Sequence, residues 1–335
     1  MLHSARVQLL GLCVLAGALL AACGGGGGSP GGGGPPPPTA TPSGPTPTPP
    51  LLPPSGQIYL GAYVNTSNTS PPLLTDTSTF EALIGRKLVL HTHYYGFYDD
   101  FPSTAEADDL ANGRIPIESW NCQVPNASIA SGASDALLQK RAAALAAYGH
   151  PIFVRYMWEM NLPANPNNRA LCWDPNSDNP NFHFSPANYV GAWLHMRQVF
   201  QASGATNVIW LWNPSGSGTD PIPYYPGPSA VDWVGFDEYD DANQPFDQVY
   251  AAAYSVLQPL GKPIVLVETG ATTAQQPIYF PQAVPALQST YPQIKAYMYF
   301  DAIGHQNNWI LTGVGLEAFA TMAGDPYLAA TPPAH

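Results

Sequence analysis

Short apolar runs alternate with helix-like stretches from about residue 57 to residue 328. Runs rich in β-branched and aromatic residues predict strands, and a nearly continuous apolar run such as PIVLV predicts a strand buried on both faces. Eight strands are predicted in this way, at residues 57–63, 87–93, 114–120, 151–159, 207–212, 231–237, 263–268 and 294–300.

Four of the intervening stretches have clear helical character. Residues 135–148 are rich in Ala and Leu and end at Gly149, a residue type that commonly follows a helix. Ser185 and Pro186 open the next helix, which runs to Ala202, as N-cap and first helical residue. Two further helices are predicted at 246–260 and 282–291.

Strands that alternate with helices predict parallel strands joined by right-handed crossovers. Eight such units in about 270 residues predict a single (β/α)₈ barrel, because barrels often use this length in one domain. A doubly wound sheet is the alternative, but no Gly-rich dinucleotide-binding loop follows the first predicted strand. We therefore expect residues 57–328 to form one α/β barrel.

The first 22 residues predict an export signal. Arg6 precedes an apolar run that is too short and too rich in Gly and Ala for a membrane-spanning helix, and such a run is typical of a signal peptide. The sequence Leu-Ala-Ala-Cys at its end resembles the lipoprotein cleavage box, in which Cys23 becomes the lipidated first residue. An ordinary signal peptide with a chance cysteine is the alternative.

Residues 23–56 predict a tether. Their Gly, Pro and Thr-Pro repeats cannot build a core and favour a disordered, partly extended linker. We therefore expect an exported protein, anchored in the cell envelope at the outer membrane or cell surface, that contacts the membrane through its lipid alone.

Composition narrows the choice of ligands and of redox compartment. The chain has 11 Lys and Arg against 23 Asp and Glu, a balance that disfavours nucleic acid as a partner. Low charge with many aromatic residues suits neutral sugars. Of the four cysteines, Cys122 and Cys172 remain in the mature domain, and export favours a disulfide between them. Two buried free thiols are the alternative.

Two carboxylates mark the ends of opposite strands. Barrel enzymes carry their working residues at the carboxyl ends of strands, where Glu159 ends the fourth predicted strand and Glu268 the seventh. Glycoside hydrolysis needs one carboxyl group that delivers a proton and a second, ionised one that attacks the sugar. Either Glu alone could be an ion-pair partner, but the pair at these two positions indicates a shared site.

The chain resembles glycoside hydrolase family 26, a family of β-mannanases and mixed-linkage β-glucanases whose catalytic glutamates lie on strands four and seven. The matching segments are VRYMWEMN (154–161), VIWLWNP (208–214), YYPGPSAVDWVGFDEYD (224–240), PIVLVETG (263–270) and YMYFDAIGHQNNWIL (297–311). The resemblance implies that Glu159 is the acid/base, that Glu268 is the nucleophile and that Tyr239 hydrogen-bonds the nucleophile.

This sequence departs from the family pattern in the residues that would contact a sugar. The family usually has His immediately before the acid/base, where this chain has Trp158, which can stack on a sugar but cannot titrate. Related enzymes often have Trp on strand eight, where this chain has Phe300, and Trp309 could serve nearby. Substrate preference is more affected by these changes than reaction type.

Further substrate-binding residues are expected at the other strand ends. Trp120 and Trp158 are predicted to stack on sugar rings, and Asn213 and His93 to hydrogen-bond the substrate. Arg155 could orient a catalytic carboxylate or form a salt bridge inside the barrel, and the sequence leaves both interpretations open.

The sequence His91-Thr92-His93 also raises the question of a metal hydrolase. Such a site would require further His ligands on strands five and six, and the sequence has none there. We therefore expect neither a metal nor a cofactor.

The sequence thus predicts a retaining endo-β-glycanase, expected to be monomeric, that acts on β-linked polysaccharide. β-1,4-Mannan is the leading substrate, with mixed-linkage β-glucan and β-1,3-xylan as alternatives. A retaining mechanism places the two carboxyl groups about 5–5.5 Å apart. A non-catalytic carbohydrate-binding barrel is the hypothesis from another class, and the presence of both glutamates argues against it.

Overall fold

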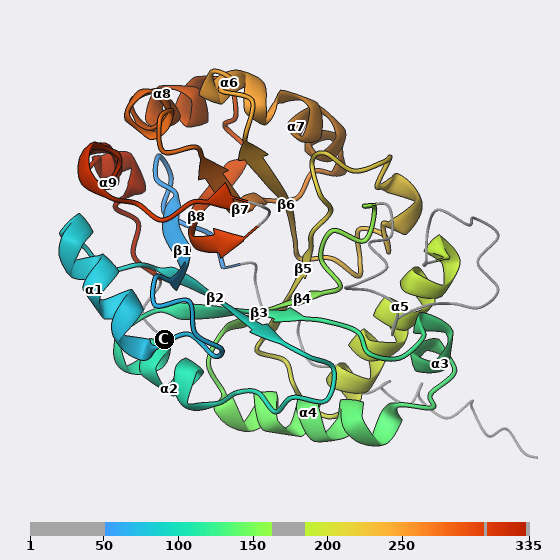
Figure 1. Ribbon diagram of the computed structural model, residues 1–335. Coiled ribbons are helices and arrows are strands. Elements are labelled where there is room, and N and C mark those ends of the chain that lie inside the picture. Colours follow the sequence, from blue (N-terminus) through green and yellow to red (C-terminus); the bar gives the residue numbers. More distant parts are fainter. Residues whose placement is uncertain (1–50, 163–184, 305–306, 333–335) are drawn as a thin grey trace, which may run out of the picture. The chain divides into compact units, whose positions relative to one another are not determined.

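The computed structural model describes residues 51–162, 185–304 and 307–332, which contain a closed barrel of eight parallel strands (Figure 1). Each strand pairs with the next along the chain, and β1 also pairs with β8, which closes the barrel. The strands are β1 (Tyr59–Asn65), β2 (Leu90–Tyr95), β3 (Ile115–Trp120), β4 (Ile152–Tyr156), β5 (Val208–Trp212), β6 (Trp233–Asp240), β7 (Ile264–Ala271) and β8 (Ile294–Gly304), and a short antiparallel β9 (Asn307–Asn308) follows β8.

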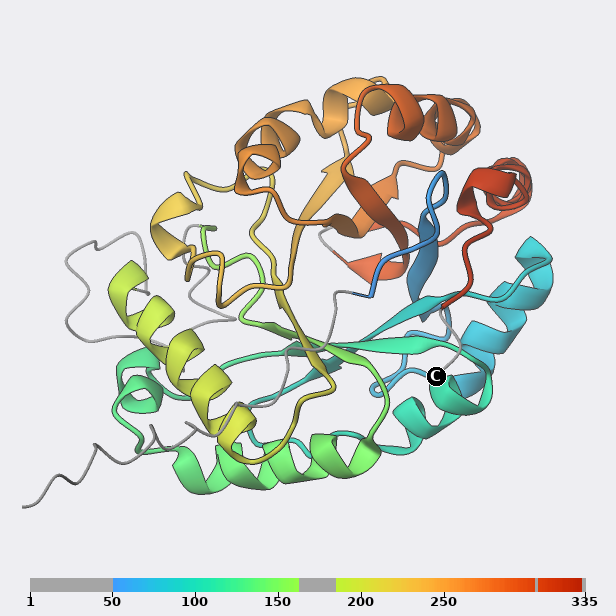
Figure 2. The same cartoon turned by 180° about the vertical axis from the view of Figure 1, so that it is seen from behind.

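Helices surround the strands, as the two opposite views show (Figures 1 and 2). They are α1 (Leu74–Ile84), α2 (Thr104–Ala111), α3 (Asn126–Ala130), α4 (Asp135–Tyr148), α5 (Pro186–Ala202), α6 (Phe246–Val249), α7 (Ala251–Leu257), α8 (Gln276–Ser289) and α9 (Gly313–Ala323). The predicted (β/α)₈ fold is confirmed, and each of the eight predicted strands overlaps an observed one.

The predicted helices 135–148 and 186–202 have the observed bounds, with Gly149 in the left-handed conformation and Ser185 as N-cap. The prediction for 282–291 was wrong at its start, because α8 begins at Gln276 and continues through Pro281 and Pro285. Both prolines are exposed, so water can satisfy the carbonyl groups that lose their intrahelical partner.

Four helices were not predicted: α1, α2, α3 and α9. The signal for α2 was present in the sequence. Ser103 and Glu106 form a capping box. The Ser103 hydroxyl accepts a hydrogen bond from a backbone N–H of the first turn, and the Glu106 carboxylate accepts one from the backbone N–H of Ser103. This motif fixes where α2 begins beside β2 and β3.

Alternation along the strands separates two apolar layers. Inward side chains, among them Phe153, Leu211, Trp233 and Met298, fill the barrel interior. Outward side chains pack beneath the helices in a larger cluster that includes Val154 and many aromatic rings. Trp233 is fully buried in the inward layer.

The folded domain is longer than predicted at both ends. Leu51, which was assigned to the linker, and Ala330 are buried in the cluster of inward side chains. The folded domain therefore includes residues on both sides of the predicted range 57–328. The predicted signal peptide 1–22, Cys23 and most of the linker lie outside the described residues.

Within the described part of the chain, the helices are all too short or too polar to cross a lipid bilayer.

Asp301, on β8, is a buried carboxyl group on the outward face. Its Oδ1 accepts the backbone N–H of Leu311 at 2.7 Å. Burial raises the pKa of Asp301 to about 7, and the charge of Asp76 adds to this effect. In an unfolded chain an aspartate ionises near pH 4. Between about pH 4 and pH 7 the folded protein therefore retains a proton that the unfolded chain loses, and stability falls as the pH rises.

We expect Asp301→Asn to remove this penalty, because the amide oxygen can still accept the Leu311 N–H. The melting temperature should rise by roughly 2 °C or more at pH 8, and change little at pH 4. Asp220→Asn is the control, because Asp220 also accepts a backbone N–H but is exposed. Equal effects of Asp301→Asn at both pH values would contradict this account.

Candidate active site

Side chains from four strands converge at the carboxyl-terminal mouth of the barrel. They are Tyr94 on β2, Arg155 on β4, Asp237 and Tyr239 on β6, and Glu268 on β7. Each of the first four continues the inward side of its strand, as Arg155 does two residues after the core residue Phe153.

Glu268 reaches the mouth through an irregularity in β7. Phe236 pairs with Leu266 and Asp237 with Glu268, so Val267 is an extra residue in β7. Val267 is part of the interior core, and the bulge allows the next residue, Glu268, to face the mouth as well.

Three donors hold the carboxylate of Glu268. Arg155 Nη2 and Tyr94 Oη each donate to Oε1 at 2.6 Å, and Tyr239 Oη donates to Oε2 at 2.9 Å. The residue is only 1% exposed. Donors to a buried carboxylate stabilise its ionised form, the form required of a nucleophile.

Arg155 is a buried cation shared by two carboxyl groups. Its Nη1 contacts both oxygens of Asp237 at 3.0 and 3.1 Å, while Nη2 contacts Glu268. Burial and the charge of Glu268 raise the pKa of Asp237 well above its usual range, although Arg155 opposes the shift. These effects favour the protonated form of Asp237. Arg155 thus contacts a predicted catalytic carboxylate, Glu268, and also forms a buried salt bridge with Asp237, so its contacts agree with both interpretations that the sequence left open.

Glu159 lies on an irregular turn directly after β4. Glu159 and Met157 have φ values of 55° and 45°, in the left-handed region that non-glycine residues rarely occupy. The backbone N–H of Glu159 donates to the carbonyl of Asn213 at 2.7 Å, which ties the turn to the end of β5. Backbone strain of this kind costs about 1–3 kcal/mol and clusters at functional sites.

Asn161 fastens the same turn from its other end. Its Nδ2 donates to the carbonyl groups of Ser215 and Thr219 at 2.9 and 2.7 Å, and its Oδ1 accepts the N–H of Ser215 at 2.8 Å. The loop after β4 and the loop after β5 are thereby held together beside Glu159.

The two glutamates share neighbours. The charges of both Glu159 and Glu268 raise the pKa of Asp237 and of Tyr239, after burial as the first cause. Glu159 is 7% exposed and Glu268 is 1% exposed. The structure thus brings the two predicted catalytic residues to one mouth, while the separation of 5–5.5 Å stays a prediction.

Aromatic rings line the same mouth. Trp158 is partly exposed, with its ring 5.2 Å from that of Tyr94 and 5.1 Å from the guanidinium carbon of Arg155. Phe300 packs 5.0 Å from Tyr63 and 6.0 Å from Tyr239. Trp158 and Phe300 lie where the sequence places substrate contacts, and their role in binding stays a prediction.

The prediction that Trp120 stacks on a sugar was wrong. Trp120 is fully buried on the outward face of β3, its Nε1 donates to the carbonyl of Phe97 at 3.2 Å, and its ring stacks on Phe97. The inward residue at this strand end is Ser119, which bonds to Arg155.

Trp309 and Asn213 contact residues of the site. Trp309 is 1% exposed, donates its Nε1 to the carbonyl of Gly304 and packs 4.8 Å from the ring of Tyr239. Asn213 is fully buried, and its carbonyl holds the N–H of Glu159. Their predicted contacts with substrate stay predictions, because Glu268 at the same mouth is as deeply buried as Trp309.

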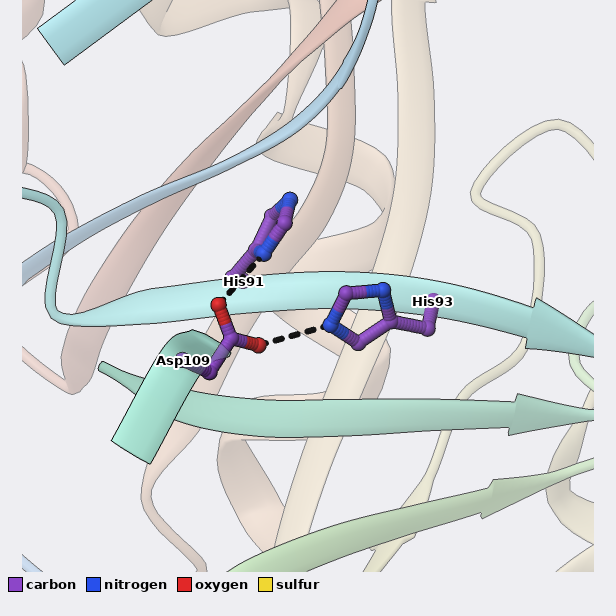
Figure 3. Close-up of side chains that lie close together, drawn as sticks. All are labelled: His91, His93 and Asp109. Atoms are coloured by element: carbon purple, nitrogen blue, oxygen red, sulfur yellow. Dashed lines mark hydrogen bonds and ion pairs between the residues drawn. The ribbon is translucent and has the colours of Figure 1, made fainter. Parts of the chain in front are cut away.

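His93 was predicted to bind substrate, and the structure corrects this as well. His93 lies on the outward face of β2 and its Nε2 contacts Asp109 Oδ2 at 2.6 Å, while His91 Nδ1 contacts Asp109 Oδ1 at 2.8 Å. Figure 3 shows both imidazole rings directed at the carboxylate of Asp109 on α2. The strand itself separates this cluster from the mouth.

These three residues are the kind of group that can hold a metal ion. The donor set does not fit a cation, because both oxygens of Asp109 already serve the histidines and Arg114 Nη1 lies 3.0 Å from Oδ1. Burial favours the protonated form of Asp109, but His91 and His93 outweigh it and hold its pKa well below the usual range. The cluster is a buried ion-pair network that fastens β2 to α2.

Of the predicted disulfide, Cys122 is buried just beyond β3, whereas Cys172 lies outside the described residues. The bridge stays a prediction.

Sequence reasoning missed Tyr94 and Asp237 as partners of the catalytic residues. Both continue an inward alternation that starts from a core residue, Leu90 in β2 and Trp233 in β6.

Comparison with known proteins finds similarity to glycosidases. The family model described as glycosyl hydrolase family 26 matches residues 187–317, a range that includes Tyr239 and Glu268. Endoglucanase H of Acetivibrio thermocellus is 27% identical over 265 residues, which cover 74% of this chain and 28% of that relative. A mannan endo-1,4-beta-mannosidase of Bacillus subtilis is 27% identical over 106 residues, 31% of this chain and 28% of that relative. The chain therefore spans about a quarter of the length of these relatives.

Solved structures share the fold. A β-mannanase of this family from Bacteroides ovatus superposes with a TM-score of 0.59 at 14% identity, covering 83% of this chain and 91% of the other. A mannanase from Bacillus subtilis gives 0.59 at 17% identity, over 82% and 87% of the two chains.

We expect Asp109→Asn to lower the free energy of unfolding by about 3 kcal/mol, because His93 and Arg114 lose a buried charge partner. Urea denaturation at pH 7 measures this loss. Asp100→Asn, at an exposed ion pair with Lys140, is the control and should cost less. Wild-type stability should be the same with and without EDTA, and stabilisation that is lost on chelation would show that the cluster holds a metal after all.

Proposed function

The chain belongs to glycosyl hydrolase family 26, and from this membership and the geometry of its site we propose that it hydrolyses a β-linked polysaccharide with retention of configuration. One observation carries the proposal: Glu268 is buried at the end of β7 with Arg155, Tyr94 and Tyr239 donating to its carboxylate. Glu159 stands on a strained turn after β4 at the same mouth.

Glu268 is the nucleophile in this proposal. Its carboxylate oxygen attacks the anomeric carbon while the bond from that carbon to the leaving oxygen breaks, and a covalent glycosyl-enzyme results. Arg155 and the two phenols favour the ionised carboxylate and fix its direction. A positive charge on buried Arg155 is assured, since its two carboxyl partners outweigh burial and raise its pKa.

Glu159 acts as acid and then as base. It first donates its proton to the leaving oxygen, and it then removes a proton from the water that attacks the glycosyl-enzyme. The hydrogen bond from its N–H to Asn213 and the contacts of Asn161 hold the turn in place through both steps.

The sugar next to the cleaved bond meets aromatic surface. Trp158 is the partly exposed ring beside Arg155, and Phe300 lies across the mouth against Tyr239. Aromatic faces stack on the apolar face of a pyranose ring. We propose that these two residues bind the substrate, in place of the His and Trp common in the family.

β-1,4-Mannan is the leading substrate, since the two solved structures described above and two of the curated relatives are mannanases. Mixed-linkage β-glucan is the second candidate. It is favoured by the relative that matches most of this chain, which is an endoglucanase. β-1,3-Xylan remains an alternative within the same reaction. Action within the polysaccharide chain, rather than at its end, is part of the proposal.

Export, a lipid anchor at Cys23, a bridge between Cys122 and Cys172 and a monomeric state are further proposals, each resting on the sequence alone. An envelope-bound enzyme of this kind would cleave polysaccharide outside the cell.

Products of the purified domain, residues 51–332, should test substrate and stereochemistry together. We expect reducing ends from mannan or lichenan, little from laminarin, and a product whose anomeric proton first appears in the β configuration by NMR. Initial appearance of the α-anomer would contradict retention, and inactivity on mannan, lichenan, β-1,3-xylan and cellulose would contradict the proposed function.

We expect Glu159→Ala and Glu268→Ala to lose activity in different ways. Glu159→Ala should lose about 10²- to 10⁴-fold on polysaccharide but little on an aryl glycoside with an acidic leaving group, and azide should restore turnover with a β-glycosyl azide product. Glu268→Ala should be inactive on both substrates. Glu317→Ala, at an exposed residue of α9, is the control. Full activity of either variant would remove its residue from the mechanism.

A further inference from the structure

We propose that Tyr94 is a positioning residue for the nucleophile: its phenol fixes the orientation of the Glu268 carboxylate and favours the ionised form. The proposal rests on the role of Glu268 in the function proposed above. Neither the family pattern matched by this sequence nor the motifs around the two glutamates include β2.

The contact is short and lies at the reacting group. Tyr94 Oη donates to Glu268 Oε1 at 2.6 Å, the same distance as the bond from Arg155 Nη2 to that oxygen. Arg155 Nη2 also lies 3.4 Å from the phenol oxygen. The phenol and the guanidinium therefore act on one oxygen from two different strands, β2 and β4.

A second phenol acts on the other oxygen. Tyr239, on β6, donates to Oε2 at 2.9 Å. A carboxylate that is bonded at both oxygens by groups on separate strands cannot rotate about its terminal carbon–carbon bond without breaking one of these bonds. Tyr94 is thus one of two phenols that set the plane from which Glu268 attacks.

The ring of Tyr94 is itself held in place. It makes edge contacts with Tyr63 at 4.8 Å and with Trp158 at 5.2 Å, and the guanidinium carbon of Arg155 lies 5.7 Å from its centre. A donor whose ring is packed on two sides loses little freedom when it bonds the carboxylate.

Alternation in β2 explains why this phenol faces the mouth. The neighbours of Tyr94 along the strand, His93 and Tyr95, face outward and bond to Asp109 and Glu106 of α2. Tyr95 Oη donates to Glu106 Oε1 at 2.6 Å, the same distance as in the inward pair. β2 therefore carries two adjacent phenol–carboxylate bonds, one at the catalytic mouth and one in the outer layer.

Tyr94 stays a donor across the working range. Burial raises the pKa of its phenol well above the usual range, and the charge of Glu268 adds to this effect while Arg155 opposes it. Among the described residues, the titratable and charged groups that interact with Glu268 include Tyr63 of β1, Tyr94 of β2, Arg155 of β4, and Asp237 and Tyr239 of β6. The charge of Glu159, on the turn after β4, acts on Asp237 and Tyr239.

Tyr94→Phe tests the proposal, because it removes only the phenol oxygen. We expect kcat/KM to fall roughly 10- to 100-fold, the usual worth of a bond to a charged group. The acid limb of the pH profile should move to higher pH by about 1 pH unit, since the ionised nucleophile loses a donor. Tyr95→Phe is the matched control, and it should lower the melting temperature without moving the acid limb.

A second, nearly isosteric variant keeps the proposal testable if Tyr94→Phe fails to fold. Tyr94 replaced by 3-fluorotyrosine keeps the ring and offers a more acidic donor, so the acid limb should move to lower pH. A structural role alone would leave the acid limb of both Tyr94 variants where it is in the wild-type protein, and that result would overturn the proposal.

Carboxyl NMR separates this proposal from the proposed function. The chain has seven glutamates, so ¹³C labelling of their side-chain carboxyl groups gives few signals, and Glu268→Gln identifies the one that matters. Its titration midpoint should rise in Tyr94→Phe even if every polysaccharide proves not to be a substrate. An unchanged midpoint together with an active wild-type enzyme would refute the role of Tyr94 and leave the glycosidase intact.

Discussion

The site depends on one buried cation. Arg155 is fully buried between Asp237 and Glu268, and no other described cation contacts either carboxyl group. Burial and the charge of Glu268 raise the pKa of Asp237 well above its usual range, although Arg155 opposes the shift. Glu268 also accepts two phenol donors, which favour its ionised form. Removal of Arg155 would leave two acids repelling each other in the barrel mouth.

Both proposed catalytic residues stand on irregular backbone. Regular alternation would have turned Glu268 away from the mouth after Val267, and the bulge in β7 restores it. Glu159 follows β4 on a left-handed turn instead of extending the strand. A barrel strand offers an inward position only at every second residue, so these deviations allow two functional side chains to be placed where the chemistry needs them. The surrounding regular strands supply the rigidity that holds them there.

The fold was largely predictable because its strands are long apolar runs and several helices carry strong end signals, as at Gly149 and Ser185. The two glutamates were predictable because a polar residue that ends an apolar run is conspicuous. Which face of the strand a side chain occupies was not predictable from the sequence. Trp120 and His93 are each one residue away from an inward position, and a one-residue difference places a side chain on the opposite face. Tyr94 was missed because its partner lies 174 residues away in the sequence, although the alternation that starts at Leu90 places its side chain on the inward face.

Asn161 has a consequence for protein engineering. Its side chain bridges the segment that carries Glu159 and the loop after β5, through Ser215 and Thr219. Grafting a foreign loop between β5 and β6, a common way to alter the shape of a groove, would displace Glu159, the proposed proton donor, along with the loop. Loop exchange in this barrel should therefore treat the two loops as one transplantable module, with the amide bridge carried over intact.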